Sequence, residues 1–325
     1  MERIPSSNND REYNPIDRTI VSVNLDQKLH KKLVQQALRE GRRSRDEFIR
    51  TPELKDICGE IISFVHELAH AYGSKRNKVP LKYIHFVDNF SGESGPGEKL
   101  SLLSGRTIAN GIEIKIEPGK AIALKHVHVL IHELIHAYSF NQASVIAIDD
   151  HLEVRTVPSR SGLAVTIPDM ENNREYFRGL NEAITETLAL KVFEEVLDSS
   201  DISQNLKDIF NTLKYETFDA EGLVIGLRDN EEGESYIESN GYTYHRMVFS
   251  AMIHEIMRTN SDQYGSHNEV ERIFFEAYFT GNFEVVAKII EKTFGKSTFK
   301  RLAQADEFSP EIFAESVGMK IESSD

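Results

Sequence analysis

The chain of 325 residues is long enough to bury one large core or two ordinary ones, and its 40% hydrophobic and 28% charged residues are typical of a globular protein. No run approaches the ~20 consecutive apolar residues of a membrane-spanning helix. The polar start lacks the apolar segment of a secretory signal. The one cysteine, Cys58, excludes an internal disulfide and cysteine-based zinc sites. We therefore expect a cytoplasmic protein in which histidine and carboxylate side chains hold any metal.

The formal charge of −14 is distributed unevenly along the chain. Of 38 basic and 52 acidic side chains, residues 1–50 carry 11 and 8, which leaves 27 and 44 for residues 51–325. A nucleic-acid surface spread over the whole molecule is therefore excluded, because such a surface must be basic. Only the basic head remains a candidate for binding nucleic acid.

A short strand and two helices are expected near the start, after a disordered tail. From Thr19 to Leu25 apolar and polar residues alternate, which predicts a strand. Apolar residues then recur at helical spacing as far as Gly41, and Ser44 can cap a second short helix.

One long helix and two strands are predicted next. Thr51 and Pro52 suit the N-cap and the first position of a helix that we expect to reach Tyr72. Residues 81–87 predict a strand. Over residues 112–117 isoleucines alternate with charged residues, which predicts a strand with one polar face at the edge of a sheet.

The rest of the chain is predicted to be mainly helical. A helix is expected over residues 120–140, followed by a hairpin whose strands, 152–157 and 163–167, flank a turn at 158–161. Beyond Leu180 only helices are predicted, over residues 182–197, 203–214, 242–258, 268–279 and 283–294. This order predicts an α+β fold, with a small mixed sheet and its helices first and an all-helical C-terminal subdomain after them.

The sequence contains the motif H-E-x-x-H twice, at residues 66–70 and 132–136. Residues four apart on a helix lie on one face, so two histidines at this spacing can bind one zinc ion. The glutamate beside the first histidine can then take a proton from a metal-activated water. Three fixed letters are a weak signal, so a third ligand must distinguish the two copies.

The second copy has a candidate third ligand on the next strong helix. Glu182 follows His136 by 46 residues in the run N-E-A-I-T-E, and Glu186 lies four residues further on. Because the two glutamates share one helix face, one can bind zinc while the other accepts a hydrogen bond from a ligating histidine.

The pairing of H-E-L-I-H with N-E-A-I-T-E resembles the thermolysin-like gluzincin metallopeptidases, whose pattern is H-E-x-x-H followed by N-E-x-x-x-D/E on the next active-site helix. The resemblance covers roughly residues 80–200. It implies a peptidase with one zinc ion per chain, held by His132, His136 and Glu182. It further implies Glu133 as general base and Glu186 as the support of His132.

Two further expectations concern the substrate. The predicted edge strand over residues 112–117 matches that family, in which such a strand pairs with the extended substrate, and an exposed strand edge can bind any peptide through its backbone. Related metallopeptidases also take a tyrosine or histidine from the helical half to stabilise the oxyanion. The run Y-T-Y-H-R resembles that segment, and we expect Tyr244 to have this role. Aromatic packing at a helix start is the alternative.

The first motif lacks such a partner helix. A strand follows it, and no glutamate-bearing helix comes before the second motif. We therefore expect His66, Glu67 and His70 to be structural or surface groups on an ordinary packing helix. His128, one turn before His132, is expected to be partly buried and hydrogen-bonded.

The basic head resembles a ribbon-helix-helix DNA-binding module across residues 18–50, which carry 9 basic and 4 acidic side chains. The resemblance implies a dimer whose paired strands place Ser22 and Asn24 toward DNA bases. Pro52 departs from the pattern because it shortens the second helix. The alternative is a solvated helical hairpin packed on the body.

Two other classes of function stay open. A peptide-binding or DNA-binding regulatory protein with a degenerate peptidase domain would keep every ligand named above. A ferritin-like di-iron protein could use the E-x-x-H units at 67–70 and 133–136 together with Glu182 and Glu186, although the glycine-rich, strand-like stretch between the units does not suit a four-helix bundle. The expected organisation is a tail, a basic head, a zinc-binding peptidase core and a helical subdomain, at residues 1–17, 18–50, 51–200 and 201–325.

Overall fold

A computed structural model describes part of the chain, and the basic head and tail lie almost wholly outside that part. The described residues are 19–21, 51–87, 105–108, 111–116, 122–147, 154–167, 174–199, 202–211, 225–229, 235–239, 242–305 and 310–319. Of the strand expected at the start, only β1, Thr19–Val21, is described. Ser22, Asn24 and the two helices of the head lie outside the described residues, so the DNA-binding module stays a prediction.

The first long helix, α2 (Pro52–Ala71), begins as predicted. The Thr51 side chain accepts a hydrogen bond from the backbone N–H of Leu54 at 3.2 Å, and Pro52 occupies the first turn, where its missing N–H costs nothing. One face of the helix is buried, through Ile57, Cys58, Ile61, Ile62, Val65 and Ala69. This face packs against α3 and α4, so α2 is a core helix.

A three-stranded sheet follows, and it corrects the edge-strand prediction. After the 3-10 turn η1 (Leu81–Tyr83) come β2 (Ile84–Val87), β3 (Gly105–Ile108) and β4 (Gly111–Lys115). The strand order is β2-β4-β3, with β4 parallel to β2 and antiparallel to β3. The strand expected at the edge, β4, is therefore the central one.

The burial of one charged residue of β4 explains this error. Glu113 is fully buried, although its alternation with isoleucines suggested a solvent-facing side. In the register of the sheet it stands opposite His85 on β2 and Arg106 on β3. A carboxylate can be buried where hydrogen bonds or opposite charges compensate for the loss of water. Polar alternation alone did not distinguish a buried carboxylate of this kind from an exposed face.

A second sheet has five strands in the order β1-β5-β6-β7-β8. After β1 these are β5 (Asn141–Ala147), β6 (Val154–Ser161), β7 (Ala164–Ile167) and β8 (Arg174–Tyr176). β1 pairs in parallel with β5, and the other pairs are antiparallel.

The β6–β7 hairpin forms as expected, but its turn lies later in the chain. Pro158 is inside β6, where the register with β5 shifts by one residue, and such irregularities tolerate proline. The turn comes instead at Gly162, which has φ +58° in the left-handed region. Glycine adopts this conformation without steric cost.

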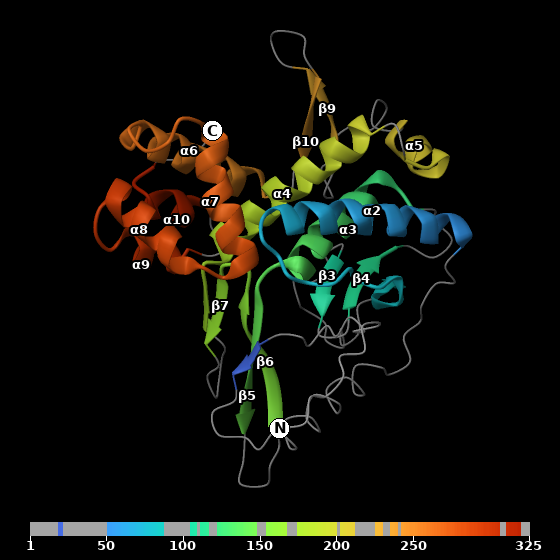
Figure 1. Cartoon of the computed structure of the whole chain (residues 1–325), viewed down its shortest axis with the longest axis horizontal. Coiled ribbons are helices and arrows are strands. Elements are labelled where there is room, and N and C mark those ends of the chain that lie inside the picture. The colour runs from blue at the N-terminus through green and yellow to red at the C-terminus, as the bar shows by residue number, and fades with distance from the viewer. Residues whose placement is uncertain are drawn as a thin grey trace, which may run out of the picture.

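Two of the described helices bury a larger share of their residues than the other helices do. α3 (Leu124–Tyr138) and α4 (Arg178–Asp198) pack against each other, and each buries residues around most of its circumference. A helix that is buried on nearly all sides belongs to the centre of a domain. In Figure 1, α4 runs between α2 and α3 on one side and the C-terminal helices on the other.

The C-terminal part is mostly helical but contains a hairpin that the sequence did not predict. Its helices are α5 (Gln204–Asn211), α6 (Thr243–Thr259), α7 (His267–Thr280), α8 (Phe283–Phe294), α9 (Thr298–Ala303) and α10 (Pro310–Ser316). Between α5 and α6, β9 (Ile225–Asp229) and β10 (Ser235–Ser239) pair in antiparallel fashion. The prediction of an all-helical subdomain is therefore wrong at this hairpin, which projects from the body in Figure 1.

One cluster of buried hydrophobic residues joins these parts, from Ile57 on α2 to Val317 near the end of α10. It includes side chains from both sides of the boundary predicted near residue 200. The fold is α+β, as predicted, with the buried pair α3–α4 at its centre. Among the described helices, none is long and apolar enough to cross a membrane.

Candidate metal centre

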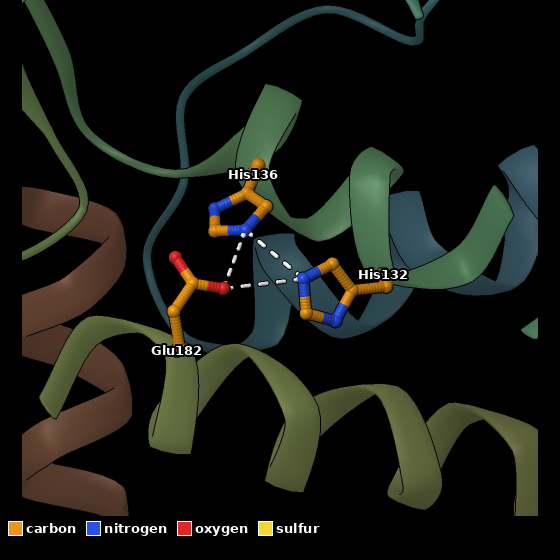
Figure 2. Close-up of side chains that lie close together, drawn as sticks. All are labelled: His132, His136 and Glu182. Carbon is orange, nitrogen blue, oxygen red and sulfur yellow. Dashed lines mark hydrogen bonds and ion pairs between the residues drawn. The ribbon is translucent and has the colours of Figure 1, made fainter. Parts of the chain in front are cut away.

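Three side chains from α3 and α4 converge on one point (Figure 2). His132 and His136 project from adjacent turns of α3, and Glu182 reaches them from the first turns of α4. One nitrogen of each histidine and one carboxylate oxygen of Glu182 all lie within 4.8 Å of one another. This group could hold a metal ion. Among the described residues, it is the group of histidine and acidic side chains that lie close enough together to do so.

The distances within the group match the edges of a small coordination sphere. Nε2 of His136 lies 3.1 Å from Nε2 of His132 and 3.2 Å from Oε2 of Glu182, and His132 Nε2 lies 3.3 Å from the same oxygen. Ligand atoms that are each ~2.0–2.1 Å from a tetrahedral zinc ion are about 3.3–3.4 Å apart. Two imidazole nitrogens this close need a proton or a cation between them. The three residues therefore fit one metal ion of zinc-like size.

His132 is held in place by a carboxylate behind it. Its other nitrogen, Nδ1, lies 3.0 Å from Oε2 of Glu186, as the sequence predicted for this pair. The second oxygen of Glu186 lies 2.9 Å from Nε2 of His128, and both of these side chains are about 1% exposed. A carboxylate on Nδ1 keeps the proton on that nitrogen and leaves Nε2 free for a metal.

His136 is held by a phenol from the C-terminal helices. Its Nδ1 lies 3.3 Å from the hydroxyl of Tyr278 on α7, and this hydroxyl lies 2.8 Å from Oγ1 of Thr185 on α4. Tyr278 is fully buried. Burial raises its pKa well above the usual value, so the phenol stays protonated.

Glu182 is held by its neighbour in the sequence. Nδ2 of Asn181 donates to Oε1 of Glu182 at 3.3 Å, while Oδ1 of Asn181 accepts from the backbone N–H groups of Leu163 and Ala164 at 3.0 and 3.2 Å. The asparagine thus connects the glutamate to the turn between β6 and β7. Each of the three candidate ligands therefore has its own supporting side chain.

The site is strongly polarised. Burial by itself disfavours the charged form of His132, but hydrogen bonds and charges of Glu182 and Glu186 outweigh it and hold the pKa of His132 well above its usual value. Burial likewise opposes ionisation of Glu182, yet His136 and His132 hold the pKa of this carboxyl well below its ordinary value. Without a metal, His132 therefore tends to hold a proton beside the carboxylates of Glu182 and Glu186, and a metal cation can replace this proton.

The predicted catalytic residues fall at different places. Glu133 lies on α3 next to His132 and is 8% exposed. Tyr244 lies at the start of α6 with 52% of its surface exposed. It is Tyr242, two residues earlier, whose ring stacks on that of His132, with the centroids 5.9 Å apart and the planes at 11°. Tyr242 also has a left-handed backbone with φ 50°, a conformation that is strained for tyrosine.

The first motif does not join the metal group. His66 and His70 lie on α2 with their rings 4.2 Å apart, and the ring of His66 contacts that of Tyr138 at 5.5 Å. Nε2 of His70 lies 2.8 Å from the carbonyl oxygen of Arg76. Burial, followed by the charge of His70, lowers the pKa of His66. These contacts agree with the structural role expected for the motif.

Sequence reasoning missed the residues that hold His136. Tyr278 lies 142 residues from the histidine and carries no motif, so spacing could not connect the two. Thr185 lies inside the recognised N-E-A-I-T-E run, where helical geometry places it one turn after Asn181.

Comparison of the chain with protein-family models, with curated proteins and with solved structures finds no match.

Proposed function

We propose that this chain is a zinc-dependent peptidase of gluzincin type. The observation that carries the proposal is the convergence of His132, His136 and Glu182 within 4.8 Å, with a separate supporting side chain for each. A set of two imidazoles and one carboxylate is the donor set of catalytic zinc sites, which leave a coordination position for water or substrate.

The chemistry would be the addition of water to a peptide carbonyl. Bound zinc would supply a Lewis acid that polarises the carbonyl and lowers the pKa of the attacking water. Glu133, beside His132 on α3, would take the proton of that water and then pass it to the leaving amine. The products are a carboxylate and an amine, and the proton taken from water ends on the amine.

The substrate would bind along β3. Within the described residues, β3 pairs with β4 on one side only, and it packs next to α3. An extended peptide can add to such an outer strand through backbone hydrogen bonds. β3 thus takes the place that the sequence analysis gave to residues 112–117.

A catalytically inactive peptide binder would keep the same three ligands. The two functions differ at Glu133, because binding needs no general base. A di-iron centre is disfavoured, since Glu67 and His70 are exposed on α2 and are not part of the metal group.

The test is a pair of matched substitutions in the two motifs. Glu133→Gln should retain zinc but lose at least about a hundredfold in peptide turnover, because the general base is gone. Glu67→Gln, the same change at the equivalent position of the first motif, should leave turnover near the wild-type value. Loss of hydrolysis in Glu67→Gln with activity retained in Glu133→Gln would place the catalytic glutamate on α2 and contradict the proposal. Zinc binding without any hydrolysis by the wild-type chain would favour the peptide binder.

A further inference from the structure

The support of His136 is a neutral phenol, whereas the support of His132 is a carboxylate. An ionised carboxylate can only accept a hydrogen bond from the imidazole, but a phenol can either donate or accept one. The direction of the Tyr278–His136 hydrogen bond therefore decides which nitrogen of His136 is free for a metal.

The hydroxyl groups around Tyr278 have already used their protons. Oγ1 of Thr185 donates to the carbonyl oxygen of Asn181 at 2.8 Å. Oγ of Ser139, whose hydroxyl also neighbours the phenol, donates to the carbonyl oxygen of His136 at 2.7 Å. Since a hydroxyl has one proton, both groups can only accept from Tyr278.

The phenol proton therefore points to these hydroxyl groups and away from His136. Tyr278 donates to Thr185 at 2.8 Å, which leaves only the lone pairs of its oxygen to face Nδ1 of His136 at 3.3 Å. Nδ1 must be the donor in this contact. The chain of hydrogen bonds runs one way, from His136 through Tyr278 and Thr185 to the backbone of α4.

We infer that Tyr278 is a positioning residue that fixes the tautomer of His136, with the proton on Nδ1, so that Nε2 is the atom presented to the metal. This inference rests on the proposed metal site. Tyr278 lies on α7, one of the C-terminal helices, whereas the candidate ligands all come from α3 and α4. The inference therefore gives α7 a role in the site.

Packing keeps the phenol ring from turning away. The ring is fully buried, and it lies against the turn at Gly162 so closely that a Cβ on that residue would be 2.5 Å from Cε2 of Tyr278. The ring also meets Phe279 edge-on, with centroids 5.1 Å apart. The hydroxyl is thus fixed in position as well as in direction.

The experiment compares two buried tyrosines of the full-length chain, each changed to phenylalanine. Tyr278→Phe removes the acceptor of His136 Nδ1. Tyr138→Phe is the matched control, because Tyr138 is equally buried and its hydroxyl accepts a hydrogen bond from the backbone N–H of Val79 at 2.9 Å, away from the ligands. Zinc affinity is measured by competition with a chromophoric chelator. We expect a roughly 10–100-fold loss of affinity in Tyr278→Phe and no more than a fewfold loss in Tyr138→Phe.

A second readout does not depend on affinity. In the zinc-loaded wild type, NMR should show slowly exchanging imidazole Nδ1–H protons for both His132 and His136. Tyr278→Phe should lose protection of the His136 proton only. Wild-type affinity together with a protected His136 proton in Tyr278→Phe would overturn the inference, and so would an equal loss of affinity in Tyr138→Phe.

Two outcomes are separated by the design. If the wild-type chain bound no zinc, the proposed metal site itself would fail, whereas zinc affinity and His136 protection that are both unaffected by Tyr278→Phe would overturn only the inference about Tyr278. If Tyr278→Phe does not fold, Thr185→Val and Thr185→Ser address the same hydrogen bonds. The serine keeps the acceptor and should bind zinc like the wild type, and the valine should bind roughly tenfold or more weakly. Equal affinities for the two would overturn the inference.

Discussion

At the scale of single residues, the candidate site consists of three possible metal ligands, each with a different supporting side chain. Glu186 faces His132, Tyr278 faces His136 and Asn181 faces Glu182. Such supporting groups orient the ligands and adjust their basicity. The motifs in the sequence contain the ligands and two of the supports, because these are spaced along two helices. The third support, Tyr278, comes from a distant helix, and only tertiary packing brings it there.

The two candidate tyrosines make a direct comparison. We predict that Tyr242→Phe lowers kcat for peptide hydrolysis by roughly 10²–10³, which is the usual effect of removing an oxyanion donor. The reason is that the stacking of its ring on His132 brings Tyr242 beside the candidate metal group, whereas Tyr244 is half exposed. Tyr244→Phe, made in parallel, should be near wild type. The opposite ranking in steady-state kinetics would restore Tyr244, the choice made from the sequence.

The polarised site also predicts how metal affinity depends on pH. The pKa of His132 in the metal-free protein lies well above its usual value, so at lower pH a metal must displace a proton from this ring. Zinc affinity should therefore fall as the pH drops below that raised pKa, by up to about tenfold per pH unit for one proton. Calorimetry in buffers of different ionisation enthalpy would measure the released proton. Affinity that is constant across neutral pH would contradict this.

The same pKa shifts determine how the stability of the metal-free protein depends on pH. The raised pKa of His132 stabilises the folded state. This stabilisation is fully present at a pH below the ordinary pKa of histidine, and it is lost as the pH rises through the raised pKa. The lowered pKa of Glu182 contributes stability above its ordinary value that is lost as the pH falls through the lowered one.

At the scale of elements, the sequence predicted helices better than strands. The cap and first-turn residues located the start of α2, and a helix was expected over residues 120–140, where α3 lies, because the signals for helices are local. The strands depended on partners far along the chain. β4 became central because β2 and β3 both pair with it, and Pro158 entered β6 because a shifted register accepts it. The hairpin β9–β10 lies where only helix had been expected.

The turn between β6 and β7 should be sensitive to substitution because it packs against the site. A Cβ on Gly162 would lie 2.5 Å from the ring of Tyr278 and 2.6 Å from Oδ1 of Asn181, in a backbone conformation that alanine rarely adopts. Gly162→Ala should cost about 1–3 kcal/mol of unfolding free energy from overpacking alone, and it should weaken zinc binding.

The control for this prediction is a glycine in open surroundings. Gly59 lies in α2, and a Cβ there would meet nothing within 4 Å. Gly59→Ala should be neutral or stabilising by up to about 1 kcal/mol, because alanine is the better helix former. Chemical denaturation of both variants checks the pair, and equal stabilities would argue against close packing at Gly162.

At the scale of the whole molecule, the candidate site lies where helices from before residue 200 meet helices from after it. α3 and α4 provide the ligands, α6 contributes the stacked Tyr242 and α7 contributes Tyr278. The hydrophobic cluster is continuous across these helices. Metal binding should therefore stabilise the folded chain as a whole and not one half of it, because a metal that binds only the folded state shifts the unfolding equilibrium.

The proposed function requires that His132, His136 and Glu182 bind one zinc ion. The test is the metal content of the full-length protein, purified with zinc and measured by elemental mass spectrometry. The wild type is compared with His132→Ala and with His66→Ala, the matched change in the first motif. We expect one zinc per chain in the wild type and in His66→Ala, and almost none in His132→Ala. Zinc retained in His132→Ala, or lost in His66→Ala instead, would contradict it.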